Sequence, residues 1–208
     1  MATIEHSVLT SSDLHEPKGV ASASSNEVYV ADGTGSGAWL TAYTAGTEDF
    51  QDTQGAQSLG VGYANRTFLS NDGLGPLSTS ASRLPGRSAI YDTSSDEFDF
   101  GGGGYVIGDQ ITIRVDFTAV TSGANHEITL GMDLAIGTAA AYTFRPYRQN
   151  FKTAATYSNV ISYFHFDVGN NFTQDNPAKL FAYSDNSGDT IDINGFRIFV
   201  TPKNVVWA

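Results

Sequence analysis

The chain has 208 residues, which is enough for one sizeable core with an additional arm, or for two small domains. It carries 22 acidic and 11 basic residues without a concentrated basic patch, so its net charge of -11 excludes nucleic acid as an expected partner. Cysteine is absent, and no apolar run approaches the ~18 residues of a membrane span, so we expect neither disulfides, thiolate metal sites nor a membrane partner.

The composition favours strands. Only 16% of the residues are charged, whereas glycine and aromatic residues are frequent. Such material suits strands joined by tight turns better than amphipathic helices. The sequence therefore predicts an all-β protein.

The first distinctive stretch is "DLHEPKGVASASSNEVYVADGTGSGAW", residues 13–39. Pro17 fixes its own φ and biases Glu16 toward extended geometry. We therefore predict a rigid, non-helical strip from which His15, Glu16 and Lys18 project, and which can dock in an extended groove.

The second half of this stretch predicts a strand and a turn. "NEVYV", which contains Tyr29, is typical of a short strand, and "ADGTGSGAW" of a turn that delivers Trp39 to an apolar pocket. A unit of this kind can add a strand to a partner. The alternative is that it is simply the first hairpin of the main domain.

Residues 44–88 mix short apolar patches with Gly, Ser, Pro and Asn, without sustained periodicity. We predict a loop-rich region with one strand around residues 61–69. No repeat of solenoid length and no heptad pattern is present, so any extended shaft must belong to another chain.

Strict period-two alternation begins at residue 111. "ITIRVDFTAV" places one set of side chains on one face (Ile111, Ile113, Val115 and Phe117) and another set on the opposite face (Thr112, Arg114 and Asp116). A second alternating segment follows after "TSGAN" and places Ile128, Leu130, Met132, Leu134 and Ile136 on one face. The two segments predict an antiparallel hairpin.

Four more strand-like runs follow, within residues 141–151, 159–169, 179–186 and 189–202, and strands at this spacing suggest a sandwich or a barrel. The run 159–169 has apolar residues on both faces, because Phe164 and Phe166 alternate with Ile161 and Tyr163. A second copy of the chain or a long loop could cover the outer face.

The sequence predicts no catalytic, cofactor or metal site. Its glycine-rich stretches lack the neighbours of a nucleotide-binding loop, and its four histidines lack ligand spacing. The acidic segments 92–99 and 185–192 favour solvated turns over cation sites. The exposed aromatic candidates for stacking on sugar rings are Tyr142, Phe144, Tyr147 and Tyr163.

Two stretches carry a resemblance to a known class of protein. Residues 13–39 resemble a segment near the N-terminus of structural proteins of tailed bacteriophages, and "AIYDTSSDEFDF" followed by "GDQITIRVDFTAVTSGANHEITLGMDLAIGT" is similar to a β-domain of the same virion proteins. The second stretch also resembles the trimeric jelly rolls related to tumour necrosis factor and complement C1q. The resemblance implies a C-terminal jelly-roll-like β-sandwich with an extended N-terminal attachment arm.

The resemblance also implies that different regions of the chain have different roles. We expect an attachment arm at 1–45, a loop-rich connection at 46–85 and the sandwich at 86–208. The partner-binding residues would be His15, Glu16, Pro17, Lys18, Tyr29 and Trp39. Their partner would be the major capsid protein or another virion protein.

The leading hypothesis is a non-enzymatic, homotrimeric virion protein made in the host cytoplasm, either a capsid decoration or a head-fibre protein. The second is a tail-fibre protein that binds a receptor or a host surface glycan. The third is a hydrolase of surface polysaccharide, for which the sequence offers no acid or base.

Overall fold

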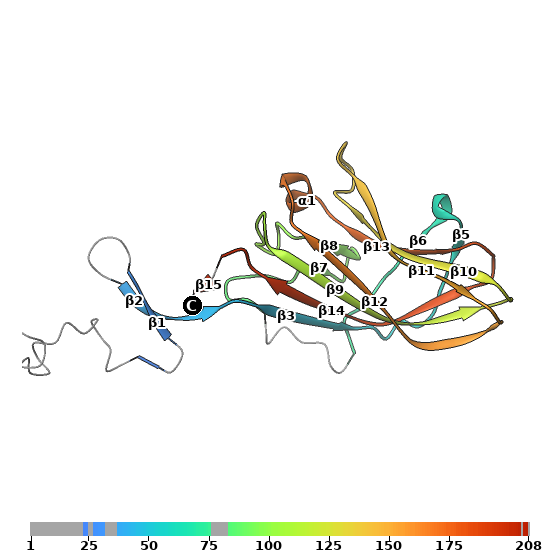
Figure 1. Cartoon of the computed structure of the whole chain (residues 1–208), viewed down its shortest axis with the longest axis horizontal. Helices are drawn as coiled ribbons and strands as arrows, with labels where there is room; N and C mark the ends of the chain where they lie inside the picture. The colour runs from blue at the N-terminus through green and yellow to red at the C-terminus, as the bar shows by residue number, and fades with distance from the viewer. Residues whose placement is uncertain (1–22, 25–26, 32–36, 76–82, 205, 208) are drawn as a thin grey trace, which may run out of the picture. The chain divides into compact units, whose positions relative to one another are not determined.

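Figure 1 shows the computed structural model, which describes residues 23–24, 27–31, 37–75, 83–204 and 206–207. Strands make up nearly all of the regular secondary structure in the described part, which confirms the predicted all-β class. The chain divides into two compact units, Met1–Tyr43 with Trp207–Ala208, and Thr44–Val206.

The larger unit is a sandwich of two five-stranded sheets. The first sheet has the order β12-β9-β14-β3, with β4 beside β14. Its strands are β3 (Gly46–Gln51), β4 (Gln57–Ser58), β9 (Gln110–Thr121), β12 (Ala155–Asp167) and β14 (Thr190–Thr201). We call it the groove sheet.

The second sheet has the order β11-β10-β13-β5, with β6 beside β13. Its strands are β5 (Gly60–Val61), β6 (Thr67–Phe68), β10 (His126–Leu134), β11 (Tyr142–Phe151) and β13 (Lys179–Ser184). Among the strands from β9 to β14, β10 and β11 are the one consecutive pair within a sheet, and the chain changes sheet between all the others. This alternation gives the predicted jelly-roll-like sandwich.

The predicted hairpin between residues 111–117 and 128–136 is wrong. β9 pairs with β12 and β14, whereas β10 pairs with β11 and β13 in the opposite sheet. Alternation shows which side chains share a face, but it does not identify the strand that pairs with the backbone. β9 and β10 each bury their apolar face in the same core from opposite sheets.

The core lies between the two sheets, as the alternation predicts. The inward side chains Ile111, Ile113, Val115 and Phe117 of β9 are fully buried. The ring of Phe117 meets that of Tyr147 in β11 at 5.4 Å, edge to face. This contact joins the two sheets through aromatic packing.

The region 46–85 was expected to be a loop-rich connection, but it contributes strands to the sandwich. It supplies β3 to β6, so the strands of the sandwich begin at residue 46 and not at 86. The single strand predicted around 61–69 is instead β5 and β6, separated by the 3-10 turn η3 (Tyr63–Asn65). Two-residue strands are too short for their alternation to be recognised in the sequence.

Shorter elements complete the fold. β7 (Tyr91–Asp92) and β8 (Glu97–Phe98) form a two-stranded sheet, and the helix α1 (Asn171–Asp175) begins after the capping residue Asn170. A separate three-stranded sheet has the order β1-β2-β15, and its strands are β1 (Glu27–Ala31), β2 (Gly37–Tyr43) and β15 (Val206–Trp207). No helix in the described ranges is long and apolar enough to cross a membrane.

Candidate functional site

The structure describes two of the six predicted partner-binding residues. Tyr29 in β1 and Trp39 in β2 lie directly opposite each other, and their rings meet edge to face at 5.5 Å. Both side chains are half-buried. Trp39 was expected to enter an apolar pocket, and one of its contacts in the structure is the ring of Tyr29. The other four residues, at positions 15 to 18, lie outside the described residues.

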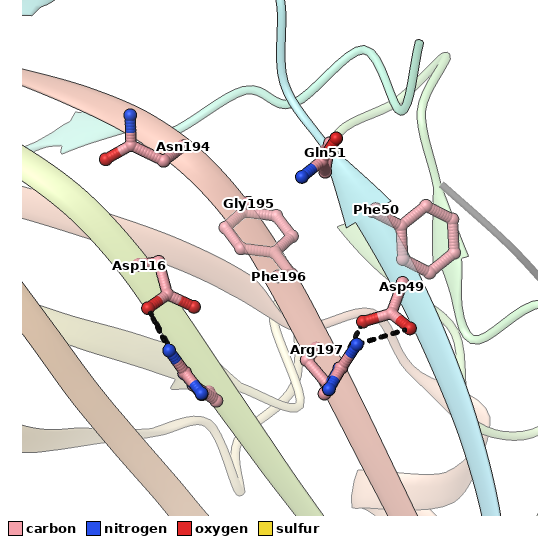
Figure 2. Close-up of a pocket in the computed structure, with 9 residues that line it drawn as sticks. Asp49, Phe50, Gln51, Asp116, Asn194, Gly195, Phe196 and Arg197 are labelled. Atoms are coloured by element: carbon pink, nitrogen blue, oxygen red, sulfur yellow. Dashed lines mark hydrogen bonds and ion pairs between the residues drawn. The ribbon is translucent and has the colours of Figure 1, made fainter. Parts of the chain in front are cut away.

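A groove lies on the outer face of the groove sheet, with a cavity volume of about 240 Å³. Figure 2 shows its side chains, which come from β3, β9 and β14 and from the bulge at Asn194. The lining residues are Asp49, Phe50, Gln51, Arg114, Asp116, Asn194, Gly195, Phe196 and Arg197.

Two arginine–aspartate pairs occupy this groove. Nε and Nη2 of Arg114 donate to Oδ1 of Asp116 over 3.1 and 2.6 Å. Arg197 donates to both carboxylate oxygens of Asp49, as the dashed lines in Figure 2 show. Hydrogen bonding to the aspartate, reinforced by its charge, raises the pKa of each arginine further. The formal charges of the two arginines and the two aspartates sum to zero.

The floor of the groove depends on Gly195. A Cβ at this position would lie 2.9 Å from the carbonyl oxygen of Phe50 and 3.4 Å from Cα of Gln51. The pairing of β14 with β9 also shifts between Ile193 and Gly195, which leaves Asn194 exposed at the rim. A side chain in place of Gly195 would fill the space and push against the backbone of β3.

A second hollow, of about 180 Å³, lies beside η3 on the other sheet. Arg66 pairs with Asp133 at 2.7 Å, and the hydroxyl of Tyr63 lies 2.7 Å from that of Thr143. The ring of Tyr63 packs on Phe181, which is fully buried although it points away from the sandwich core. The polar groups of this hollow form hydrogen bonds and an ion pair with one another. We therefore interpret them as structural contacts that hold the η3 segment against the sheet.

The four aromatic residues that were candidates for sugar stacking differ in how exposed their rings are. Tyr147 packs on Phe117, and burial raises its pKa to about 12. The ring of Phe144 packs against that of Phe164, with their centroids 5.9 Å apart. Tyr142 and Tyr163, in contrast, are 49% and 54% exposed. Only the last two can therefore offer a ring to a ligand.

The acidic segments serve local structure. Asp189 is fully buried and accepts hydrogen bonds from Ser122, Ser184 and His126. Asp92 accepts from Ser94 in the turn between β7 and β8. Within the part of the chain that the structure describes, no three His, Asp or Glu side chains gather as a metal site would require.

Sequence reasoning placed Arg114 and Asp116 on the outward face of their strand but did not assign them to a site. The signal was present in the alternation of "TIRVDF" and "GFRIF". What it lacked was the register, because Asp49 and Arg197 are separated by 148 positions. Only the folded sheet brings the four groups together.

No family model and no curated protein matches this chain. Among solved structures, the chain is similar to the CBM22-1 xylan-binding domain of Paenibacillus barcinonensis Xyn10C, with 10% identity and a TM-score of 0.41, over 78% of this chain and 99% of that one. It is also similar to the CBM22-1-GH10 modules of Clostridium thermocellum xylanase Xyn10B complexed with xylohexaose, with 17% identity and a TM-score of 0.39, over 78% of this chain and 30% of that one.

A third similar structure is that of infectious bursal disease virus, Gt strain, with 8% identity and a TM-score of 0.34, over 86% of this chain and 38% of that one. The neighbours thus include viral and carbohydrate-binding proteins. Because these TM-scores lie below 0.5, the likenesses do not indicate what this chain binds.

Proposed function

We propose that the protein is a non-enzymatic structural protein of a tailed-bacteriophage virion, joined to the particle by its N-terminal unit and displaying its β-sandwich. The observation that carries the proposal is the division of the chain. β1 and β2 form a separate three-stranded sheet with β15 and join neither sheet of the sandwich. The sandwich therefore needs no strand from residues 1–43, which leaves them available for attachment.

The likeness of residues 13–39 to phage virion segments supports the same role. An N-terminal segment with an aromatic pair, preceded in the sequence by the strip that Pro17 is predicted to stiffen, suits a contact made through a few anchoring side chains. A capsid decoration or head-fibre protein is the first form of the proposal. The major capsid protein would then be the partner of residues 1–43.

Binding without catalysis fits the chemistry of the groove. Asp49 and Asp116 each accept hydrogen bonds from an arginine, so each carboxylate of the groove is engaged in an ion pair. Bond cleavage in a polysaccharide typically requires two carboxyl groups that face the scissile bond, one of them a general acid, whereas each carboxylate of this groove is bound by an arginine. The groove is thus better suited to holding a ligand than to transforming it.

We further propose that the sandwich assembles as a homotrimer through the end that carries α1. Gln174 in α1 donates to the carbonyl of Tyr105 over 2.8 Å, which ties α1 to the loop before β9. Three exposed apolar side chains lie on these two segments, Val106, Ile107 and Phe172, with Phe172 50% exposed. Neighbouring apolar side chains in solvent are typical of an assembly surface.

The attachment proposal is tested by deleting residues 1–43. We expect the shortened chain to melt within a few degrees of the full chain and to be absent from purified particles. Loss of the folded sandwich on deletion would contradict the division of roles. Normal incorporation of the shortened chain would contradict attachment through the N-terminal unit.

A further inference from the structure

The outer face of the groove sheet carries a continuous row of side chains across four strands. By register, Tyr163 of β12 lies beside Arg114 of β9, which lies beside Arg197 of β14, which lies beside Asp49 of β3. The next row places Asp116 on β9 opposite Gly195, the floor of the groove. The exposed ring of Tyr163 therefore lies at one side of the polar groove.

The groove keeps hydrogen-bonding capacity for a ligand. Asp116 receives both bonds from Arg114 on Oδ1, so Oδ2 has no hydrogen-bond partner among the described residues. Nη1 of Arg114 and Nδ2 of Asn194 likewise donate to no described residue. One acceptor and two donors thus lie on an outward face, held by partners that fix their positions.

Tyr163 adds a flat apolar surface to these polar groups. Its side chain is 54% exposed, and its position next to Arg114 fixes it at the side of the groove. An aromatic ring beside planar donors and acceptors matches a pyranose, which presents an apolar ring face and a rim of hydroxyls. An apolar peptide would leave the acceptor of Asp116 and the donors of Arg114 and Asn194 without partners.

The charges select a neutral sugar. The two arginines and two aspartates of the groove sum to zero, and the whole chain carries a net charge of -11. An anionic sugar would meet no excess of positive charge and would be repelled at long range. The volume of about 240 Å³ is below the roughly 300 Å³ at which small-molecule pockets begin, which suits one ring of a chain lying across the sheet.

We propose that this groove binds one ring of a neutral surface polysaccharide, with Tyr163 stacking on the sugar and with Arg114, Asp116 and Asn194 bonded to its hydroxyls. The activity is separate from attachment to a particle and uses no residue of the N-terminal unit. It would give a displayed sandwich a means of holding a cell surface.

The test is binding of the full-length protein to a microarray of neutral and uronic-acid-containing oligosaccharides. The strongest ligand is then titrated by calorimetry against the wild type, Tyr163→Ala and Asp116→Asn. We expect neutral ligands to bind and each variant to lose affinity by about tenfold or more. The matched control is Tyr142→Ala, which removes an equally exposed tyrosine from the other sheet and should bind within about twofold of wild type.

Melting curves show whether the variants lose affinity because the binding site is changed or because the protein is destabilised. Both groove variants should melt within a few degrees of the wild type, because Tyr163 is 54% exposed and because exposed charge pairs contribute only about 0 to 1 kcal/mol to stability. The proposal is overturned if no neutral oligosaccharide binds, if acidic ones alone bind, or if the groove variants bind as the wild type does. Presence on the particle is measured independently, so either proposal can fail without the other.

Discussion

The carboxylate of Asp189 lies 2.9 Å from Nδ1 of His126, a contact that ties the turn before β14 to the first residue of β10. Asp189 also accepts hydrogen bonds from the side chains of Ser122 and Ser184. β10 and β14 belong to opposite sheets, so this buried carboxylate joins the two layers of the sandwich at one end.

This cluster predicts a pH dependence of stability. Burial alone would raise the pKa of Asp189, but the hydrogen bonds from Ser184, Ser122 and His126 outweigh it and lower the pKa. An acid whose pKa is lowered by folding stabilises the protein fully above its unfolded pKa, about 3.9, and loses that contribution as the pH falls through the lower folded pKa. Acidification below pH ~4 should therefore lower the melting temperature of the wild type.

Asp189→Asn should destabilise the protein at pH 7 by about 1 to 3 kcal/mol, because charged hydrogen bonds to a buried acceptor are lost. Its melting temperature should also depend less on pH than that of the wild type. Thermal denaturation from pH 7 to pH 2 measures both effects, with the less buried Asp192→Asn as control. Parallel pH curves for all three proteins would rule out this role of Asp189.

The core predicts a contrast between two phenylalanines. Phe117 is fully buried against Tyr147, whereas Phe199 is 38% exposed on the outer face of the same sheet. Phe117→Ala should cost about 3 to 5 kcal/mol, and Phe199→Ala should cost less than half as much. Chemical denaturation gives both values, and equal losses would contradict the division of the sheet into inner and outer faces.

Attachment predicts an order of effects among three variants. Trp39→Ala removes an aromatic anchor and should weaken binding to empty particles by about 2 kcal/mol, roughly thirtyfold. Pro17→Ala should cost only about 0.5 to 1 kcal/mol, through extra freedom in the unbound chain. Lys18→Glu should have an effect that fades as salt rises. Competition with the wild type at two salt concentrations measures all three, and unchanged binding of a folded Trp39→Ala protein would exclude this anchor.

If the homotrimer assembles through the end of the sandwich that carries α1, a charged substitution there should prevent assembly. Phe172→Asp places a charge among exposed apolar side chains and should convert a homotrimer to monomers at micromolar concentration. Native mass spectrometry distinguishes the two states, and Phe68→Asp, at an exposed position on β6, is the control. A wild-type monomer or dimer would refute the trimer, and a trimeric Phe172→Asp protein would move the interface elsewhere.

Much of the fold could be predicted because the long strands carry their pattern in the sequence. In β9, every second residue from Ile111 to Thr121 is buried, and the alternation is visible without the structure. What alternation cannot specify is the neighbour of a strand. The four residues between β9 and β10 are compatible both with a hairpin and with a crossing to the opposite sheet, and the structure shows the crossing.

The groove could be predicted less well, because it depends on register over long separations. Arg114 and Asp116 were visible as outward-facing residues, but Asp49 lay in a segment that was expected to be a loop. The hollow itself comes from the absence of a side chain at Gly195 and the bulge beside it. Neither feature leaves a periodic signal in the sequence.

The central claim is that the protein is part of a virion and is held there by residues 1–43. Cryo-electron microscopy of intact particles of the encoding phage, with gold-labelled antibody against the sandwich as a guide, tests it most directly. We expect sandwich-sized density at regular positions on the particle, joined to another virion protein by the N-terminal unit. Particles of normal composition that contain none of this chain would contradict the claim.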